Sequence, residues 1–103
     1  MPSKSKQKGN RFEKECVDKA VEKGLNSKRA WGSDGRSLGE HSEVDLLINK
    51  HKAQCKVRKR VAKWLKPSEK VDVQVVKEDS GEVFVIQPLE KWLEMVKSLR
   101  AQK

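Results

Sequence analysis

The sequence predicts an α/β fold of mixed α+β character, with a central mixed five-stranded sheet flanked by helices. Three observations indicate this fold. Apolar residues recur at helical spacing near both ends of the chain, they alternate with polar residues in its middle, and short turns separate the alternating stretches. The 103 residues suffice for one domain, which we assign to residues 10–103 behind a basic, flexible tail over residues 1–9.

The predicted domain begins with a helix, a short strand and a loop. Helical spacing runs from about Asn10, which can cap the helix, to Lys23, and Gly24 can end it. The stretch "KRAW", residues 28–31, is typical of a short strand. Residues 32–42 hold three glycines and show no periodicity, which predicts a flexible loop.

The stretch "VDLLINKHKAQCK", residues 44–56, predicts a β-hairpin. Two alternating runs surround a polar tip, which we place at Lys50 and His51. With this tip, Asp45 faces Lys56 across the strands. Alternation sends the polar residues to one face and an apolar set to the other. The apolar set consists of Val44, Leu46, Ile48, Ala53, Cys55 and Val57.

The second half of the chain predicts a helix, two strands and a final helix. "RVAKWLK", residues 60–66, is typical of a short helix, and residues 71–76 and 82–86 alternate as strands around a turn. The connection from the hairpin is long enough for a crossover, which favours a strand over residues 71–76 that runs parallel to the hairpin's second strand. The last helix starts at Pro88 and carries one apolar stripe.

The composition indicates a polyanion as partner. The chain carries 24 Lys and Arg against 15 Asp and Glu, a net charge of +9, so nucleic acid is the leading partner, and a basic protein with solvated lysines is the alternative. The apolar runs are too short to span a membrane, which predicts a cytoplasmic, intracellular protein. Two cysteines and two histidines without metal spacing favour neither a zinc site nor a disulfide framework.

Glu13 lies on the apolar side of the first predicted helix. At about 100° per residue it falls between Ala20 and Val17, within the stripe that Phe12, Cys16 and Val21 complete. A carboxylate directed into a core is costly unless a cation, a metal or a hydrogen-bond donor meets it. Glu13 is therefore either a functional residue or one half of an ion pair with a neighbouring Lys or Arg at the edge of the core.

The polar face of the hairpin brings three functional groups together. Asp45 and Lys56 can form a simple cross-strand salt bridge, but Gln54 adds an amide oxygen beside them. Carboxylate and amide oxygens are hard ligands that suit Mg²⁺ or Mn²⁺. The ammonium group of Lys56 can then stabilise negative charge on a phosphate or position the attacking water.

These residues resemble a known family. An aspartate, then "QCK" across a hairpin, behind a helix with an inward glutamate, resembles the PD-(D/E)XK nuclease superfamily. The stretches "KGNRFEKE", "GS", "EVDLLI" and "AQCKVRKR" are similar to the archaeal-type Holliday junction resolvases and their phage and viral relatives. The resemblance runs from about Lys8 to Arg60, with a looser similarity in "VFVIQPLEKWLEMV".

The resemblance implies a restriction-endonuclease-like core and a Mg²⁺- or Mn²⁺-dependent endonuclease that cleaves four-way DNA junctions by phosphodiester hydrolysis. It implies the catalytic residues Glu13, Ser33, Asp45, Gln54 and Lys56. The metal ligands it implies are Asp45, Gln54, the backbone carbonyl of Cys55, and Glu13, and it implies no small-molecule cofactor. The chain departs from the family pattern at Val44, where a proline is usual, and at Gln54, where an acidic residue is usual.

Members of the resolvase family act as homodimers, and we expect a homodimer here. Two other functions stay open: a nuclease of the same fold that acts on other DNA, and a DNA-binding protein without catalysis. Trp31 and Trp64 lie beside basic residues and either stack on bases, pack, or form a dimer contact. The predicted DNA-binding residues are Arg11, Lys28, Arg29, Arg36, Arg58, Lys59, Arg60 and Lys63.

Overall fold

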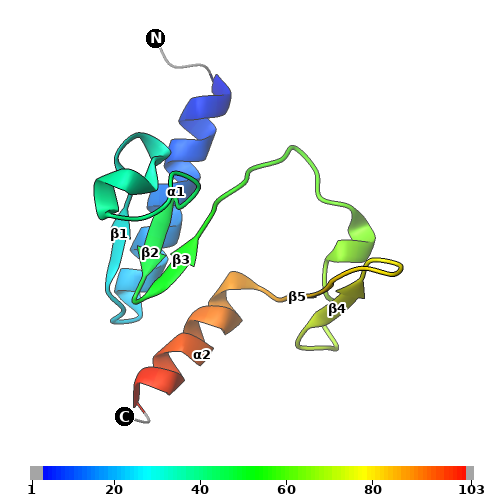
Figure 1. Ribbon diagram of the computed structural model, residues 1–103. Coiled ribbons are helices and arrows are strands. Elements are labelled where there is room, and N and C mark those ends of the chain that lie inside the picture. The colour runs from blue at the N-terminus through cyan, green and yellow to red at the C-terminus, as the bar shows by residue number, and fades with distance from the viewer. Residues whose placement is uncertain (1–3, 102–103) are drawn as a thin grey trace. The chain divides into compact units, whose positions relative to one another are not determined.

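The computed structural model describes residues 4–101 and forms two compact units, residues 1–57 and residues 58–103. We call them the N-terminal unit and the C-terminal unit. The chain is of mixed α+β class, as predicted, with two helices and two small antiparallel sheets in the described residues (Figure 1). The elements are α1 (Lys4–Glu22), β1 (Ser27–Arg29), β2 (Leu46–Ile48), β3 (His51–Ala53), β4 (Gln74–Lys77), β5 (Val83–Ile86) and α2 (Leu89–Ala101).

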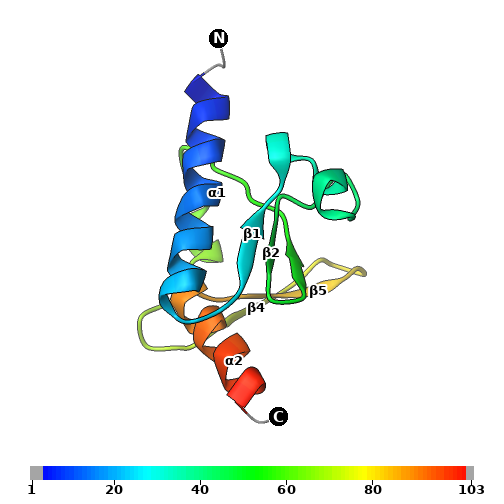
Figure 2. The ribbon, with the colours of Figure 1, turned by 90° about the vertical axis from the view of Figure 1, so that its left-hand side faces the viewer.

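The N-terminal unit is a three-stranded sheet with α1 along one face (Figures 1 and 2). The strand order is β1-β2-β3, all antiparallel, so β2 is the central strand. Its side chains Leu46 and Ile48 are 0% and 1% exposed. From α1, Cys16 and Ala20 are buried as the helical periodicity predicts, while Val21 at the margin of the predicted stripe is exposed.

The hairpin tip lies one residue earlier than predicted. Leu46 pairs with Ala53 and Ile48 with His51, which leaves Asn49 and Lys50 at the tip instead of Lys50 and His51. Asn49 adopts a φ of 52°, a left-handed conformation that Asn tolerates well. Its Oδ1 also accepts a hydrogen bond from the backbone N–H of Asn26 at 3.1 Å. This bond fixes the tip to the loop that connects α1 with β1.

The shifted tip changes partners across the strands but not the faces. Each residue now faces the position two earlier than predicted, so the register continued beyond the strands sets Asp45 opposite Gln54. The predicted pairing of Asp45 with Lys56 is therefore wrong. Because the shift is an even number of residues, the predicted apolar face is kept, with Val44, Leu46 and Ile48 buried.

Helix α1 is longer than predicted, and the following loop is more regular. The helix begins at Lys4 instead of Asn10, so residues 4–9 of the predicted tail are helical, while residues 1–3 lie outside the described part of the chain. The glycine-rich loop consists of two short 3-10 turns, Trp31–Ser33 and Gly35–Leu38. Gly35 packs so closely that an added Cβ would lie 2.0 Å from the backbone oxygen of His41.

The C-terminal unit consists of the hairpin β4–β5 and helix α2. The two strands are antiparallel, with Val75 opposite Val85, and the turn between them is confirmed. In the helix, Leu93 and Val96 of the predicted stripe are buried, but Leu99 is 58% exposed. The predicted helix over residues 60–66 is only a 3-10 turn, Lys63–Leu65.

The five predicted strands are present, but not as one mixed sheet. In residues 4–101, β4 pairs with β5 and not in parallel with the first hairpin. A restriction-endonuclease-like core and a single domain over residues 10–103 therefore stay predictions. Within the same residues, neither helix is long and apolar enough to cross a membrane.

Candidate functional site

Two charged residues are buried among those whose side chains are described, and both are predicted site residues. Glu13 is 4% exposed and Asp45 is 8% exposed. Glu13 comes from the middle of α1, whereas Asp45 immediately precedes the central strand β2. Burial of a carboxylate requires polar partners, so the surroundings of each one define what the site can do.

Glu13 faces a guanidinium group from β1. Arg29 Nε lies 3.6 Å from Glu13 Oε1, and Arg29 Nη1 donates a hydrogen bond to the backbone oxygen of Asn10 at 3.2 Å. Arg29 therefore links helix α1, at Asn10 and Glu13, to the sheet. The ion pair that the sequence left open for Glu13 is present, with Arg29 as its cation.

Asp45 is held through its backbone and through one carboxylate oxygen. Its N–H donates to the backbone oxygen of Ala53 at 2.9 Å, and its backbone oxygen accepts from the N–H of Ala30 at 2.8 Å. Asp45 Oδ2 accepts a hydrogen bond from the N–H of Cys55 at 2.7 Å. Among the described residues, none donates a hydrogen bond to Oδ1, so one oxygen of this fixed carboxylate remains for a ligand.

The two cysteines form a thiol pair beside these carboxylates. Cys16 of α1 and Cys55, two residues after β3, are free thiols that lie close enough to shift each other's pKa. Contact with Cys16, and then burial, raises the pKa of the Cys55 thiol above its usual range, and the negative charges of Asp45 and Glu13 raise it further. Both carboxylates therefore act on the same sulfur atom. The sequence predicted two separate core cysteines and missed this contact, for which residue spacing alone gives no signal.

The other predicted catalytic residues are less enclosed. Gln54 follows β3 directly and is exposed, opposite Asp45 in the hairpin register. Lys56 is exposed as well, and among the described residues it forms no ion pair with Asp45. The backbone of Ser33 ends the first 3-10 turn, but its side chain lies outside the part of the structure that is described.

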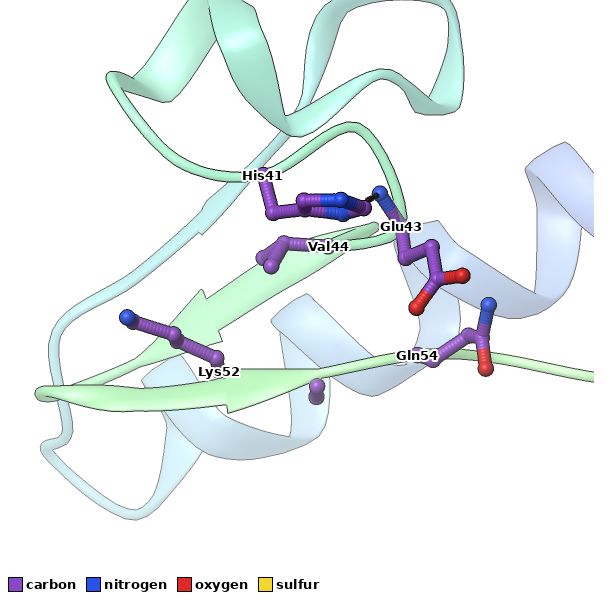
Figure 3. A pocket seen from close by; sticks show the side chains of 6 residues that line it. His41, Glu43, Val44, Lys52 and Gln54 are labelled. Carbon is purple, nitrogen blue, oxygen red and sulfur yellow. Dashed lines mark hydrogen bonds between the residues drawn. The ribbon is translucent and has the colours of Figure 1, made fainter.

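Gln54 borders a small cavity that sequence reasoning did not predict. The cavity, of about 280 Å³, lies between the turn before β2 and the end of β3, and it is lined by His41, Glu43, Val44, Lys52, Ala53 and Gln54. The side chains of Glu43 and Gln54 extend toward the same end of it (Figure 3). His41 Nδ1 accepts a hydrogen bond from the N–H of Glu43 at 3.0 Å, which orients the imidazole ring over Val44. The only sequence signal was the density of polar residues just before Asp45.

The eight predicted DNA-binding residues are all exposed. Two of the four in the N-terminal unit already face carboxylates: Arg29 pairs with Glu13, and Arg36 donates hydrogen bonds from its side chain to Asp34. These bonds hold the pKa of the Asp34 carboxyl below its usual range. The other two, Lys28 on β1 and Arg11 on α1, are exposed, so their positive charges are accessible to a phosphate.

The donor set fits a cation that keeps most of its water. In residues 4–101, no three His, Cys, Asp or Glu side chains gather closely enough to hold a metal ion among themselves. Asp45 and Gln54 nevertheless occupy facing positions when the register of the hairpin is continued by one residue beyond the strands. Mg²⁺ is commonly bound by one or two carboxylates, with water and substrate phosphate as its remaining ligands. These two side chains therefore suit Mg²⁺ or Mn²⁺ better than a fully enclosed structural metal.

We compared the chain with protein-family models, with curated proteins and with solved structures, and none of the three comparisons found a match.

Proposed function

We propose that this protein is a metal-dependent endonuclease that cleaves four-way DNA junctions by phosphodiester hydrolysis. The observation that supports this proposal best is the state of Asp45. Its carboxylate is buried and fixed by the N–H of Cys55, yet one of its oxygens accepts no hydrogen bond from any described residue. A fixed carboxylate with an available oxygen, beside an amide and within a basic protein, is suited to bind a divalent ion and a phosphate.

Asp45 and Gln54 would hold the ion in this proposal, and the backbone carbonyl of Cys55 would be a third ligand. When bound, Mg²⁺ or Mn²⁺ supplies a Lewis acid that polarises the phosphate and lowers the pKa of the attacking water. Gln54 contributes an oxygen without a negative charge, so we expect weaker ion binding than with a second carboxylate. Glu43, at the same end of the cavity as Gln54, is a nearby source of that missing charge.

Lys56, Glu13 and Ser33 complete the proposed site. The exposed ammonium group of Lys56 would stabilise negative charge on the phosphate. Glu13 would act through Arg29, because Glu13 Oε1 lies 3.6 Å from Arg29 Nε. In this role the carboxylate would direct the guanidinium group toward a DNA phosphate. Ser33 stays a proposed loop contact.

DNA would be bound mainly through its phosphates. A net charge of +9 and the eight predicted DNA-binding residues, all of them exposed, suit contacts with the DNA backbone, which recognise shape without reading bases. We therefore expect junction affinity to fall steeply with salt. A homodimer would place two such sites on opposite strands of one junction, and branched DNA and a second copy are thus the proposed partners.

One observation favours a second candidate function, a junction-binding protein without catalysis. The position opposite Asp45 carries an amide, and Lys56 makes no ion pair with Asp45 among the described residues. A nuclease of the same type that acts on linear duplex is a third possibility. The substrate and the metal dependence separate these three functions.

The test uses a labelled four-way junction and a duplex of matched sequence, with Mg²⁺, with Mn²⁺ and with a chelator. We expect cleavage of the junction only with metal. Asp45→Asn and Lys56→Ala should abolish cleavage and leave most of the junction affinity, because neither removes a DNA-binding arginine. Asp34→Asn is the matched control: it changes a half-buried aspartate of the same unit, one that Arg36 already pairs, and it should cleave normally.

Three results would count against the proposal. Normal cleavage by Asp45→Asn and Lys56→Ala would remove the site assignment, equal cleavage of duplex would favour the third function, and binding without cleavage in either metal would favour the second. Gln54→Glu sharpens the assignment, because a carboxylate at that position should lower the metal concentration needed for cleavage.

A further inference from the structure

We propose that Trp31 stacks on an unpaired nucleobase of the bound DNA, close to the strand that carries Asp45. This inference rests on the proposed function only for the identity of the nucleic acid as DNA. It assigns a binding role to a side chain for which the sequence left stacking, packing and dimer contact equally open.

The exposure of Trp31 argues against a packing role. Its side chain is 83% exposed, the largest value among the exposed large apolar residues of the described chain. Tryptophan is highly buried on average in proteins, because its ring has a large apolar surface. Here the ring does not contribute to the core of the N-terminal unit, whereas the preceding residue, Ala30, is 1% exposed.

The backbone beneath the ring is anchored, so the exposed position is a defined one. The N–H of Trp31 donates to Ser37 Oγ at 2.7 Å, and its backbone oxygen accepts from the N–H of Asp34 at 3.1 Å. Ser37 Oγ in turn donates to the backbone oxygen of Asp34 at 3.1 Å. Through Ala30, whose N–H donates to the backbone oxygen of Asp45, this anchor is continuous with the candidate site.

The chemistry around the ring suits a nucleotide. Lys28 and Arg29 precede it on β1, and the two 3-10 turns that follow carry Gly, Ser, Asp and Arg. In residues 28–43, Trp31 is the one large apolar side chain among the exposed ones, so no neighbour along this stretch extends it into an apolar patch of the kind that binds a protein partner. A lone aromatic ring beside basic side chains is the pattern that binds single-stranded nucleic acid, with the ring on the base and the cations on the phosphates.

An unpaired base is the favoured occupant because stacking needs an accessible π-face. Bases within a duplex are already stacked on both sides, whereas a base at a branch, a bulge or a single-stranded end can be displaced onto a side chain. The contact would therefore distinguish branched or open DNA from an intact duplex and leave contacts to phosphates unchanged.

The experiment measures binding by fluorescence anisotropy in the presence of a chelator, so that cleavage does not interfere. The probes are a single-stranded oligonucleotide and a duplex of the same length, and the proteins are wild type, Trp31→Ala, Trp31→Phe and Trp64→Ala. We expect Trp31→Ala to weaken single-strand binding by roughly tenfold or more and duplex binding by much less. Trp31→Phe keeps a stacking ring and should retain most of the affinity. Trp64→Ala removes an exposed tryptophan of the C-terminal unit and should retain it also.

A second measurement tests the contact directly. A 2-aminopurine placed as an unpaired base should lose fluorescence on binding wild-type protein but not Trp31→Ala, since stacking on an indole ring quenches it. Three results would overturn the proposal: equal losses on both probes, an equal loss for Trp31→Phe or Trp64→Ala, or a change of oligomeric state in Trp31→Ala by sedimentation, which would assign the ring to a second copy.

The failure of this inference is distinguishable from the failure of the proposed function. Binding is measured without metal, so a protein that never cleaves DNA can still show the Trp31 effect. Conversely, metal-dependent cleavage abolished by Asp45→Asn would stand even if Trp31→Ala bound every probe like wild type.

Discussion

The sheets of the N-terminal and C-terminal units bury their apolar residues to very different extents. In the N-terminal unit, Leu46 of the central strand is 0% exposed, whereas in the C-terminal unit Val75 and Val85 face each other across two strands and are 62% and 61% exposed. A two-stranded sheet has no central strand to shield. Among the described side chains, the two buried carboxylates, Glu13 and Asp45, both belong to the unit whose sheet has a buried central strand.

The largest expected effect comes from truncating the buried strand. Leu46→Ala removes a fully buried side chain and should lower the free energy of unfolding by about 2–5 kcal/mol. Val85→Ala should change it by less than about 0.5 kcal/mol, since its side chain is largely exposed. Urea unfolding followed by circular dichroism measures both values. A similar loss in the two variants would break the comparison, because it would mean that the exposed face of β5 is covered in solution.

The next effect separates the two arginine–carboxylate pairs of the N-terminal unit. Arg29→Ala leaves the buried carboxylate of Glu13 without its guanidinium and should cost about 1–3 kcal/mol of stability. Arg36→Ala also removes an ion pair, the one with Asp34. Because that pair is exposed to water, the loss of stability should be much smaller. Thermal unfolding of both variants provides the measurement. If Arg36→Ala lowers the melting temperature more than Arg29→Ala does, the burial of Glu13 does not strengthen its ion pair with Arg29.

Periodicity predicted the burial of Glu13, because burial is a local property of a helix, but alternation placed Asp45 on the polar face of the hairpin and did not predict its burial. Glu13 lies between apolar neighbours at helical spacing, and it is buried. The face of Val44, Leu46 and Ile48 followed in the same way from alternation and is also confirmed.

Contacts between distant parts of the chain did not follow from local patterns. The tip of the hairpin depends on the left-handed conformation of Asn49 and on its hydrogen bond with Asn26, 23 residues away. The thiol pair of Cys16 and Cys55 likewise requires α1 and β3 to meet at one point. The chemistry of Asp45, Gln54 and Lys56 predicted a metal site with a phosphate contact, whereas the catalytic role of Ser33 came only from the family resemblance.

The smallest expected effect concerns that thiol pair and the pH dependence of stability. Contact with Cys16 and burial raise the pKa of Cys55 in the folded protein above the ordinary value of 9.0. Below that value both the folded and the unfolded states keep the proton, so stability does not depend on this group. As the pH rises above it, the unfolded chain loses the proton and the folded chain keeps it, so the free energy of unfolding should decrease.

Cys55→Ser removes the contribution of this thiol, because a hydroxyl does not titrate in this range, and Cys16→Ser serves as the parallel variant, since the same contact lowers the pKa of Cys16. Urea unfolding of wild type and variant at pH 8 and pH 10 should show a steeper loss in the wild type. Lysine deprotonation affects both proteins alike and cancels in the difference. Equal slopes would mean that the thiol of Cys55 is as accessible to water as in an unfolded chain. Water would then also enter the space between α1 and the end of β3. In that case the sheet of the N-terminal unit would lack, at the position next to Asp45, the enclosure that distinguishes it from the exposed sheet of the C-terminal unit.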